Sequence, residues 1–183
     1  MKPNKISARK IAYSGLFIAL GMILPFFTGQ IPEIGRMLLP MHIPVLLCGF
    51  ICGPFYGMAV GFITPLLRSA TLSMPPMFPT AVAMAFELLA YGGFSGLFFD
   101  KFPKKRGFIY VSLILAMILG RFVWGGVSCG LYTFTENAFT WQTFMSGAYL
   151  TAIPGIILQL IIIPPIVMAV RYRSSAGSRK KER

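Results

Sequence analysis

Histidine and acidic residues are scarce in this sequence. The chain of 183 residues has one histidine, His42, and five Asp and Glu residues against 17 Lys and Arg residues. With one histidine, the chain holds neither an HExxH motif nor a metal site built from several histidines. The GxxxxGK[ST] pattern is also absent, so the chain does not bind ATP through a P-loop. Transport driven by ATP would therefore need another protein to hydrolyse it.

Cysteine is rare too. Cys48 and Cys52 stand four residues apart in an apolar segment, and Cys129 is alone. Two cysteines in a lipid-embedded segment are more typical of small packing residues than of a disulfide or a metal site. We therefore expect the chain to carry no metal and no cofactor.

Long polar segments are missing, and apolar residues take their place. The sequence is 56% hydrophobic, 14% aromatic and 12% charged, with a mean hydropathy of +0.72. These values differ from those of ordinary soluble domains and indicate an integral membrane protein. No polar stretch is long enough to fold separately in water. We expect one membrane domain over residues 1–172, followed by a basic, solvated and irregular tail over residues 173–183.

Six apolar segments are separated by short polar or Gly/Pro stretches. They cover residues 8–27, 43–53, 55–72, 80–99, 108–130 and 143–170. Backbone amides in lipid must pair internally, and these runs are too long for barrel strands, so helices are predicted throughout. The segment 43–53 is too short to cross a bilayer alone, and we interpret it as a half-span leaning on the next segment. The predicted fold is an all-α, compact, single-domain bundle of about six transmembrane helices.

Lysine and arginine gather in three clusters. Four of these residues precede the first segment, four lie between the fourth and fifth, and six follow the last, which accounts for 14 of the 17. Six crossings place all three clusters on one side, and the positive-inside rule makes that side the cytoplasm. Both termini are therefore predicted to be cytoplasmic. Because topology accounts for the net charge of +12, we expect no binding to nucleic acid.

Two opposite charges lie inside predicted helices. Glu87 falls within the segment 80–99 and Arg121 within the segment 108–130. A charge near the centre of a membrane helix costs about 2.5–3.5 kcal/mol on insertion scales, so it normally faces a partner or a wet cavity. The two residues can line a ligand site, or they can form a structural ion pair that fixes how the helices pack. Outside these spans, Glu33, Arg36 and His42 are predicted in the loop after the first helix.

Helical spacing gathers polar and aromatic groups on single faces. Arg121 and Trp124 share one face, Glu87 and Tyr91 share another, and Gln159 lies on the small-residue face of the last segment. Apolar walls with a few convergent polar groups are what a small-molecule site needs. The predicted binding residues are His42, Arg68, Glu87, Tyr91, Arg121, Trp124 and Gln159.

Small residues recur every four positions in two places. The glycines Gly49, Gly53, Gly57 and Gly61 are spaced for tight packing between helices, and Gly53 with Pro54 marks a helix stop and restart. A second stripe on the first segment makes a flat groove for another helix, either within the chain or on another subunit. It consists of Ala8, Ala12, Gly15 and Ala19.

Two stretches carry a family resemblance, "LLPMHIPVLLCGFICGPFYGMAVGFITPLL" and "MPPMFPTAVAMAFELLAYGGFSGLFF". With six apolar segments in fewer than 190 residues, the chain resembles over nearly its whole length the substrate-binding S components of energy-coupling factor (ECF) transporters. The resemblance implies a six-helix protein of the bacterial plasma membrane that captures a vitamin or related micronutrient from outside. It also implies partners, a membrane T component and two cytoplasmic ATPases, which hydrolyse the ATP. No enzymatic activity is expected of the chain itself.

The resemblance also assigns roles to segments. In that family an AxxxA-like motif on the first helix docks on the T component, and here Ala8 to Ala12 and Gly15 to Ala19 match the spacing, with Gly15 replacing one Ala. The stretches "TGQIPEIGRMLLPMH" and "SMPPMFP" correspond to the family's gating loops.

The ligand is predicted to be a small molecule with both polar signs. Glu87 can accept hydrogen bonds, Arg121 or Arg68 can hold a carboxylate or phosphate-like oxygen, and Trp124 or Tyr91 can stack on a ring. Within the family that the chain resembles, pantothenate, a pyridoxine-like or hydroxymethylpyrimidine-like ring and queuosine precursors are compatible with this description, and pantothenate and pyridoxine-like compounds rank first. Two other classes stay open, a stand-alone carrier or channel and a small membrane enzyme that uses Glu87 as an acid or base.

Overall fold

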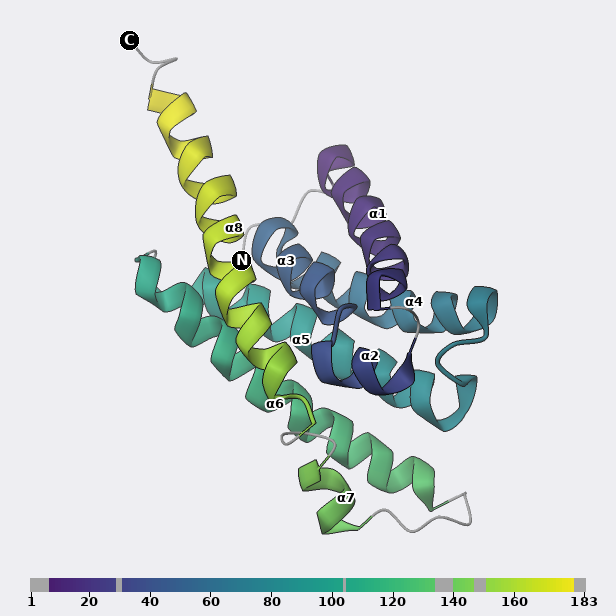
Figure 1. Ribbon diagram of the computed structural model, residues 1–183. Helices are drawn as coiled ribbons and strands as arrows, with labels where there is room; N and C mark the ends of the chain where they lie inside the picture. Colours follow the sequence, from purple (N-terminus) through teal and green to yellow (C-terminus); the bar gives the residue numbers. More distant parts are fainter. Residues whose placement is uncertain (1–6, 29–30, 104, 134–139, 147–150, 180–183) are drawn as a thin grey trace.

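The described part of the chain is helical throughout. The computed structural model describes residues 7–28, 31–103, 105–133, 140–146 and 151–179, with only the backbone at 32, 33, 36, 143 and 171–179. The predicted loop residues Glu33 and Arg36 therefore have side chains outside the described set. In chain order the helices are α1 (Ala8–Ile23), η1 (Leu24–Thr28), α2 (Pro32–Leu38), α3 (His42–Cys52), α4 (Pro54–Leu72), η2 (Met77–Ala81), α5 (Val82–Lys101), α6 (Arg106–Tyr132), α7 (Trp141–Met145) and α8 (Ile153–Arg179), as drawn in Figure 1.

Four helical stretches of the described chain are long and apolar enough to cross a membrane. They are Ala8–Thr28, Met77–Lys101, Arg106–Tyr132 and Ile153–Val170. The pair α3 and α4 lies between the first and second of them; α3 has 11 residues, and α4 has 19 but includes Arg68. The all-helical membrane fold is thus confirmed, whereas six crossings stay a prediction.

The last predicted segment, 143–170, is wrong at both ends. It begins inside the short helix α7, and a separate helix, α8, starts at Ile153, where Pro154 suits a first turn because the missing N–H of proline is not needed there. At the other end, α8 passes through Pro164 and Pro165 and continues to Arg179. The expectation of an irregular tail is therefore wrong for residues 173–179; residues 180–183 lie outside the described set.

Helix α5 lies at the centre of the bundle, against α3, α4 and α6. Its contact with α4 is close because glycines face each other: a Cβ added at Gly57 would overlap the Gly92 carbonyl, and one added at Gly61 would overlap the carbonyl of Leu88. In lipid, such close backbone packing drives helix association. Tight internal packing is thus confirmed as the role of Gly57 and Gly61. Cys48 and Cys52 are both buried, and neither forms a disulfide within the described part of the chain.

A turn at Gly53 separates α3 from α4. Gly53 has a φ of +102°, a conformation that residues with a side chain rarely adopt, and Pro54 begins the next helix. A Cβ added at Gly57 would also lie 2.8 Å from the Cα of Gly49, so the two helices fold back on each other at this turn. The predicted helix stop and restart is confirmed.

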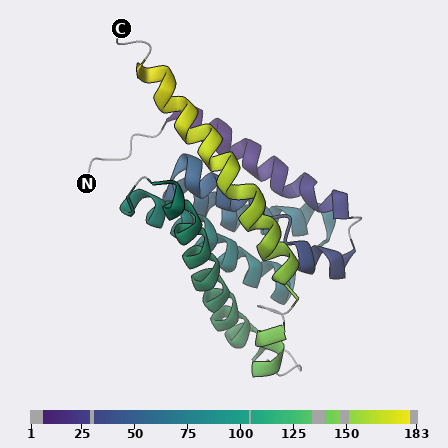
Figure 2. The ribbon, with the colours of Figure 1, turned by 60° about the vertical axis from the view of Figure 1, so that its left-hand side comes forward.

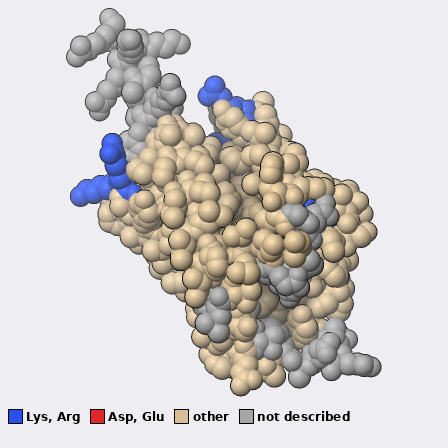
Figure 3. Space-filling view, in the orientation of Figure 1, with Lys and Arg blue, Asp and Glu red and all other residues tan. Residues whose placement is uncertain are grey.

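The described lysines and arginines gather at one end of the bundle. Figure 3 shows them mainly over the start of α1 and the turn between α5 and α6, where Arg9, Lys10, Lys101, Lys105 and Arg106 lie. The C-terminal end of α8 lies at the same end as the start of α1 in both ribbon views (Figures 1 and 2). We call this the basic end. Its charge distribution is the one that the positive-inside rule associates with the cytoplasm.

Candidate functional site

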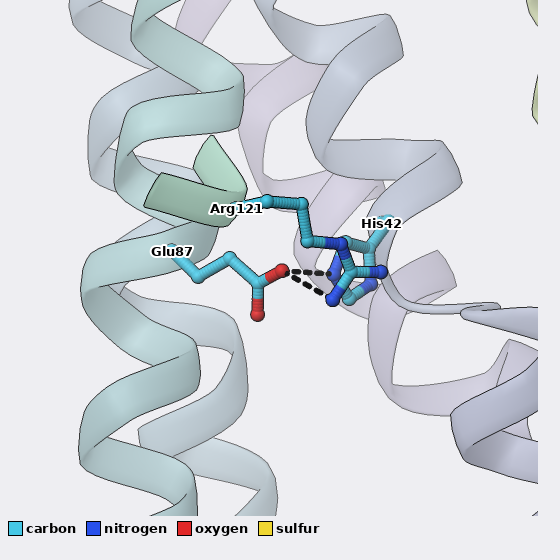
Figure 4. A network of polar contacts seen from close by, with 3 residues as sticks. All are labelled: His42, Glu87 and Arg121. Atoms are coloured by element: carbon cyan, nitrogen blue, oxygen red, sulfur yellow. Dashed lines mark ion pairs between the residues drawn. The ribbon is translucent and has the colours of Figure 1, made fainter. Parts of the chain in front are cut away.

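Three charged or ionisable side chains meet in the interior of the bundle. Glu87 of α5 forms an ion pair with Arg121 of α6, with Nη1 2.9 Å from Oε1, and the same oxygen lies 3.5 Å from Nε2 of His42, at the start of α3 (Figure 4). All three residues are at most 4% exposed. Two helices, α3 and α6, thus point polar groups at one carboxylate oxygen of α5.

The position of His42 differs from its prediction. The sequence places it in an outer loop, but it is the first residue of α3 and is 1% exposed. Its ring also meets the ring of Tyr91 edge to face, with centroids 5.1 Å apart. The loop interpretation fails because the predicted apolar segment begins at Ile43, whereas the helix begins one residue earlier, with His42.

The short length of α3 sets the depth of this cluster. Cys52 marks the basic-end terminus of α3, and His42 stands ten residues earlier, about 15 Å along the helix. Glu87 stands 14 residues before Lys101, about 21 Å from the basic end, and Arg121 stands 15 residues after Arg106, about 22 Å from it. In a hydrocarbon core of about 30 Å that begins at the basic end, the depths of Glu87 and Arg121 correspond to about two thirds of the way across.

A small apolar cavity adjoins the ion pair. It has a volume of about 90 Å³ and is lined by Tyr91, Ile114, Met117, Ile118, Arg121 and Ile156, from α5, α6 and α8. Gly120 leaves room for the Tyr91 ring, since a Cβ there would lie 3.0 Å from two of its carbon atoms. A volume of this size holds only a few water molecules. A vitamin-sized ring would therefore have to displace some of the surrounding side chains.

Two further buried polar side chains, on the helices α6 and α8 that help to line the cavity, have no hydrogen-bond partners. Gln159, one turn along α8 from Ile156, is 1% exposed, and neither its Oε1 nor its Nε2 is hydrogen-bonded. The Ser128 hydroxyl, two turns along α6 from Arg121, is fully buried and also lacks a partner. Leaving a buried polar group unpaired costs about 1–3 kcal/mol. Such groups mark places where a ligand can supply the missing bonds.

Comparison with known proteins identifies the family. The model of a family described as "ECF transporter, substrate-specific component" matches residues 9–167. The chain belongs to this family of S components. No curated protein matches it. The resemblance seen in the sequence is thus confirmed, and the protein is a substrate-specific subunit of a membrane transporter with several apolar helices.

Not every predicted binding residue of this S component joins the cluster. Arg68 of α4 is buried, but its Nη1 donates to the Met22 carbonyl at 2.5 Å, and its guanidinium lies 5.3 Å from the centre of the Phe26 ring. Arg68 thus bonds to the backbone near the C-terminal end of α1, and its role in binding stays a prediction.

Trp124 packs against α7. Its ring stacks on Phe144 of α7, with centroids 6.2 Å apart, and it is half-buried. Phe144 also lines an open groove of about 360 Å³, together with Phe122, Gly125, Gly126, Cys129, Thr140 and Trp141. None of the predicted binding residues lines this groove.

Sequence reasoning missed the apolar walls of the S component's cavity. Met117 precedes Arg121 by one turn, and Ile156 precedes Gln159 by three residues, so helical periodicity could have placed both on the interior face. The contact between His42 and Glu87 joins residues 45 positions apart. No spacing rule could have found it.

The stripe of small residues on α1 faces outward. Ala8, Ala12, Gly15 and Ala19 are exposed, and a Cβ added at Gly15 would meet nothing within 4 Å. The opposite face carries the buried residues Phe17 and Gly21 toward the bundle. Of the two partners that the sequence left open, a helix within the described part of the chain does not cover this stripe.

Proposed function

We propose that this S component captures a small polar vitamin or related micronutrient from outside the cell and delivers it inward with ATP-hydrolysing partners. The ligand would occupy the space between α3, α5, α6 and α8, where Glu87, Arg121, His42, Tyr91 and Gln159 point inward. Pantothenate and pyridoxine-like or hydroxymethylpyrimidine-like compounds match these groups in size and polarity. In this proposal both termini lie in the cytoplasm of a bacterial cell.

The observation that carries the proposal is the buried ion pair with polar groups left over beside it. A purely structural pair needs only its two partners, yet Glu87 also meets His42, and the Gln159 amide nearby has no hydrogen-bond partner. Ionisable groups inside membrane proteins mark substrate paths by default, because their burial is costly. A ligand with donors and acceptors would satisfy the amide and gain from the charges.

The proposal also assigns partners. The outward stripe of α1 would dock on a membrane T component, and two cytoplasmic ATPases would supply the energy that this chain has no P-loop to obtain. The stripe suits this role because a flat face of small residues lets a second helix approach closely in lipid.

Binding and transport can be measured separately to test the proposal. The purified protein should bind a vitamin without partners, and Glu87→Gln or Arg121→Met should weaken that binding more than tenfold, which corresponds to about 1.4 kcal/mol. Vesicles should take up the compound continuously only when the T component and both ATPases are present. Uptake by this chain alone would establish a stand-alone carrier instead, and unchanged affinity in folded variants would contradict the assigned site.

A further inference from the structure

The full charges at the candidate site cancel each other. Glu87 and Arg121 are in direct contact, and Glu87 is the one buried acid among the described residues. The other buried arginine, Arg68, is bonded to the Met22 carbonyl and does not join the cluster. The charges of Glu87 and Arg121 together therefore sum to zero.

A charged ligand would upset this balance. An anion would sit beside Glu87, and a cation beside Arg121, in surroundings where an unbalanced charge is far more costly than in water. An anion that displaced Glu87 from Arg121, or a cation that displaced Arg121 from Glu87, would also leave one partner of the pair uncompensated. A neutral polar molecule can bond to both residues without this cost.

The electric field at the start of α3 and the uncharged polar side chains also favour a neutral polar molecule. The start of α3 adds the partial positive charge of a helix N-terminus next to His42, which favours an acceptor atom at that place. The unpaired groups nearby are also uncharged, an amide at Gln159 and a hydroxyl at Ser128. They can donate to or accept from an uncharged ligand.

We propose that the ligand is an electrically neutral molecule, with an acceptor atom facing Arg121 and His42 and a donor group facing Glu87. The proposal rests on the function proposed above and narrows it. Among the compounds considered there, hydroxylated pyridine or aminopyrimidine rings meet the condition, and the carboxylate of pantothenate does not. The Tyr91 ring, which lines the cavity, offers a face or an edge to such a ring.

Congeners that differ only in charge provide the test. Calorimetric titration of the wild-type protein at pH 7.5 would compare pyridoxine with 4-pyridoxate and pyridoxamine, and panthenol with pantothenate. The neutral member of a series should bind at least tenfold more tightly than its charged congeners. Tightest binding of an anion or a cation would overturn the neutral-ligand proposal and leave the transport function intact.

If no congener binds, the small molecule that copurifies with the protein decides the question by its charge. Its mass and fragmentation give its structure; a neutral compound supports the proposal, and a charged one overturns it. Absence of any bound compound together with no congener binding would contradict the proposed function, and with it this inference.

The direction in which two substitutions change the binding affinity gives an independent test. A neutral ligand predicts that both Glu87→Gln and Arg121→Met weaken binding of the tightest congener. An anion predicts that Glu87→Gln strengthens binding, and a cation predicts that Arg121→Met does so. Ser112→Ala is the matched control, because Ser112 is also buried on α6 but donates to the Phe108 carbonyl at 2.8 Å. Thermal unfolding of each variant confirms that it is folded, and the comparison of congeners does not depend on the variants.

Discussion

At the scale of single residues, Glu87 and Arg121 depend on each other. Both are buried near the middle of the bundle, and the atoms that pair them are 2.9 Å apart. Removing one partner leaves a full charge without its counterpart, whereas removing both leaves none. Replacing one partner should therefore destabilise the protein more than replacing both partners with uncharged residues.

A double-mutant cycle should show this dependence. Arg121→Met alone should destabilise the protein by about 3–5 kcal/mol because it strands the Glu87 carboxylate. The double variant Glu87→Gln/Arg121→Met should unfold at a higher temperature than Arg121→Met alone. Thermal unfolding in detergent measures the difference, and additive effects of the two substitutions would mean that the residues do not interact.

The sequence could identify these residues but not their neighbours. Glu87 and Arg121 are conspicuous because charges are rare in apolar segments, and their pairing follows from cost alone. His42 was predicted in a loop, and both His42 and Arg68 were predicted to bind the ligand. The first proved to be buried in the cluster, because α3 starts deep inside the bundle, and the second proved to cap the end of α1. Both outcomes depend on three-dimensional packing that no local pattern encodes.

At the scale of helices, glycine determines how closely α4 and α5 approach. The Gly57 and Gly92 backbones leave no room for a methyl group on either side. The spacing of four residues predicted this packing correctly, because small residues on one face of a helix in lipid allow a second helix to approach closely. The split between α7 and α8 was not predicted, since apolar composition continues across it.

Gly57→Ala should separate α4 from α5 and lower the temperature of thermal unfolding. Overpacking of this kind typically costs about 1–3 kcal/mol. Gly107→Ala is the matched control, because a Cβ there meets nothing within 4 Å and alanine favours a helix by about 1 kcal/mol. Equal stability of the Gly57→Ala protein and the wild type would show that the interface can relax.

The outward stripe of α1 should matter for transport but not for binding. Ala12→Leu or Ala19→Leu fills the flat groove, so ATP-driven uptake should be lost while the purified variant binds its ligand with unchanged affinity. Ala59→Leu is a suitable control because Ala59 is exposed on another helix, α4. Uptake that survives both α1 substitutions would place the docking surface elsewhere.

At the scale of the whole molecule, charge gives the bundle a direction. The described lysines and arginines at the ends of helices lie at the basic end (Figure 3). The turn between α4 and η2 lies at the other end of the bundle (Figure 1). The number of crossings was harder to predict than the fold class. Composition identifies apolar helices well, but α3 and α4 are held as a pair by their contacts with α5 rather than by their own length and hydropathy.

Cysteine labelling in intact cells should establish the orientation. In a background with Cys129→Ser, which removes the one exposed cysteine of the described chain, a membrane-impermeant maleimide should label Met74→Cys from outside. It should label Lys101→Cys only after the cells are permeabilised, because the basic end is expected to face the cytoplasm. The reverse pattern would invert the topology.

The length of α3 determines where His42 lies relative to the turn at Gly53. The glycine fixes the C-terminal end of the helix, and His42 stands at the N-terminal end, ten residues from Cys52. Each residue of an α-helix adds about 1.5 Å and about 100° of rotation. Inserting or deleting one residue between them would hardly change the height of the imidazole but would swing it about 100° around the helix, away from Glu87. The number of residues in α3, more than its composition, therefore determines the direction in which the His42 side chain points.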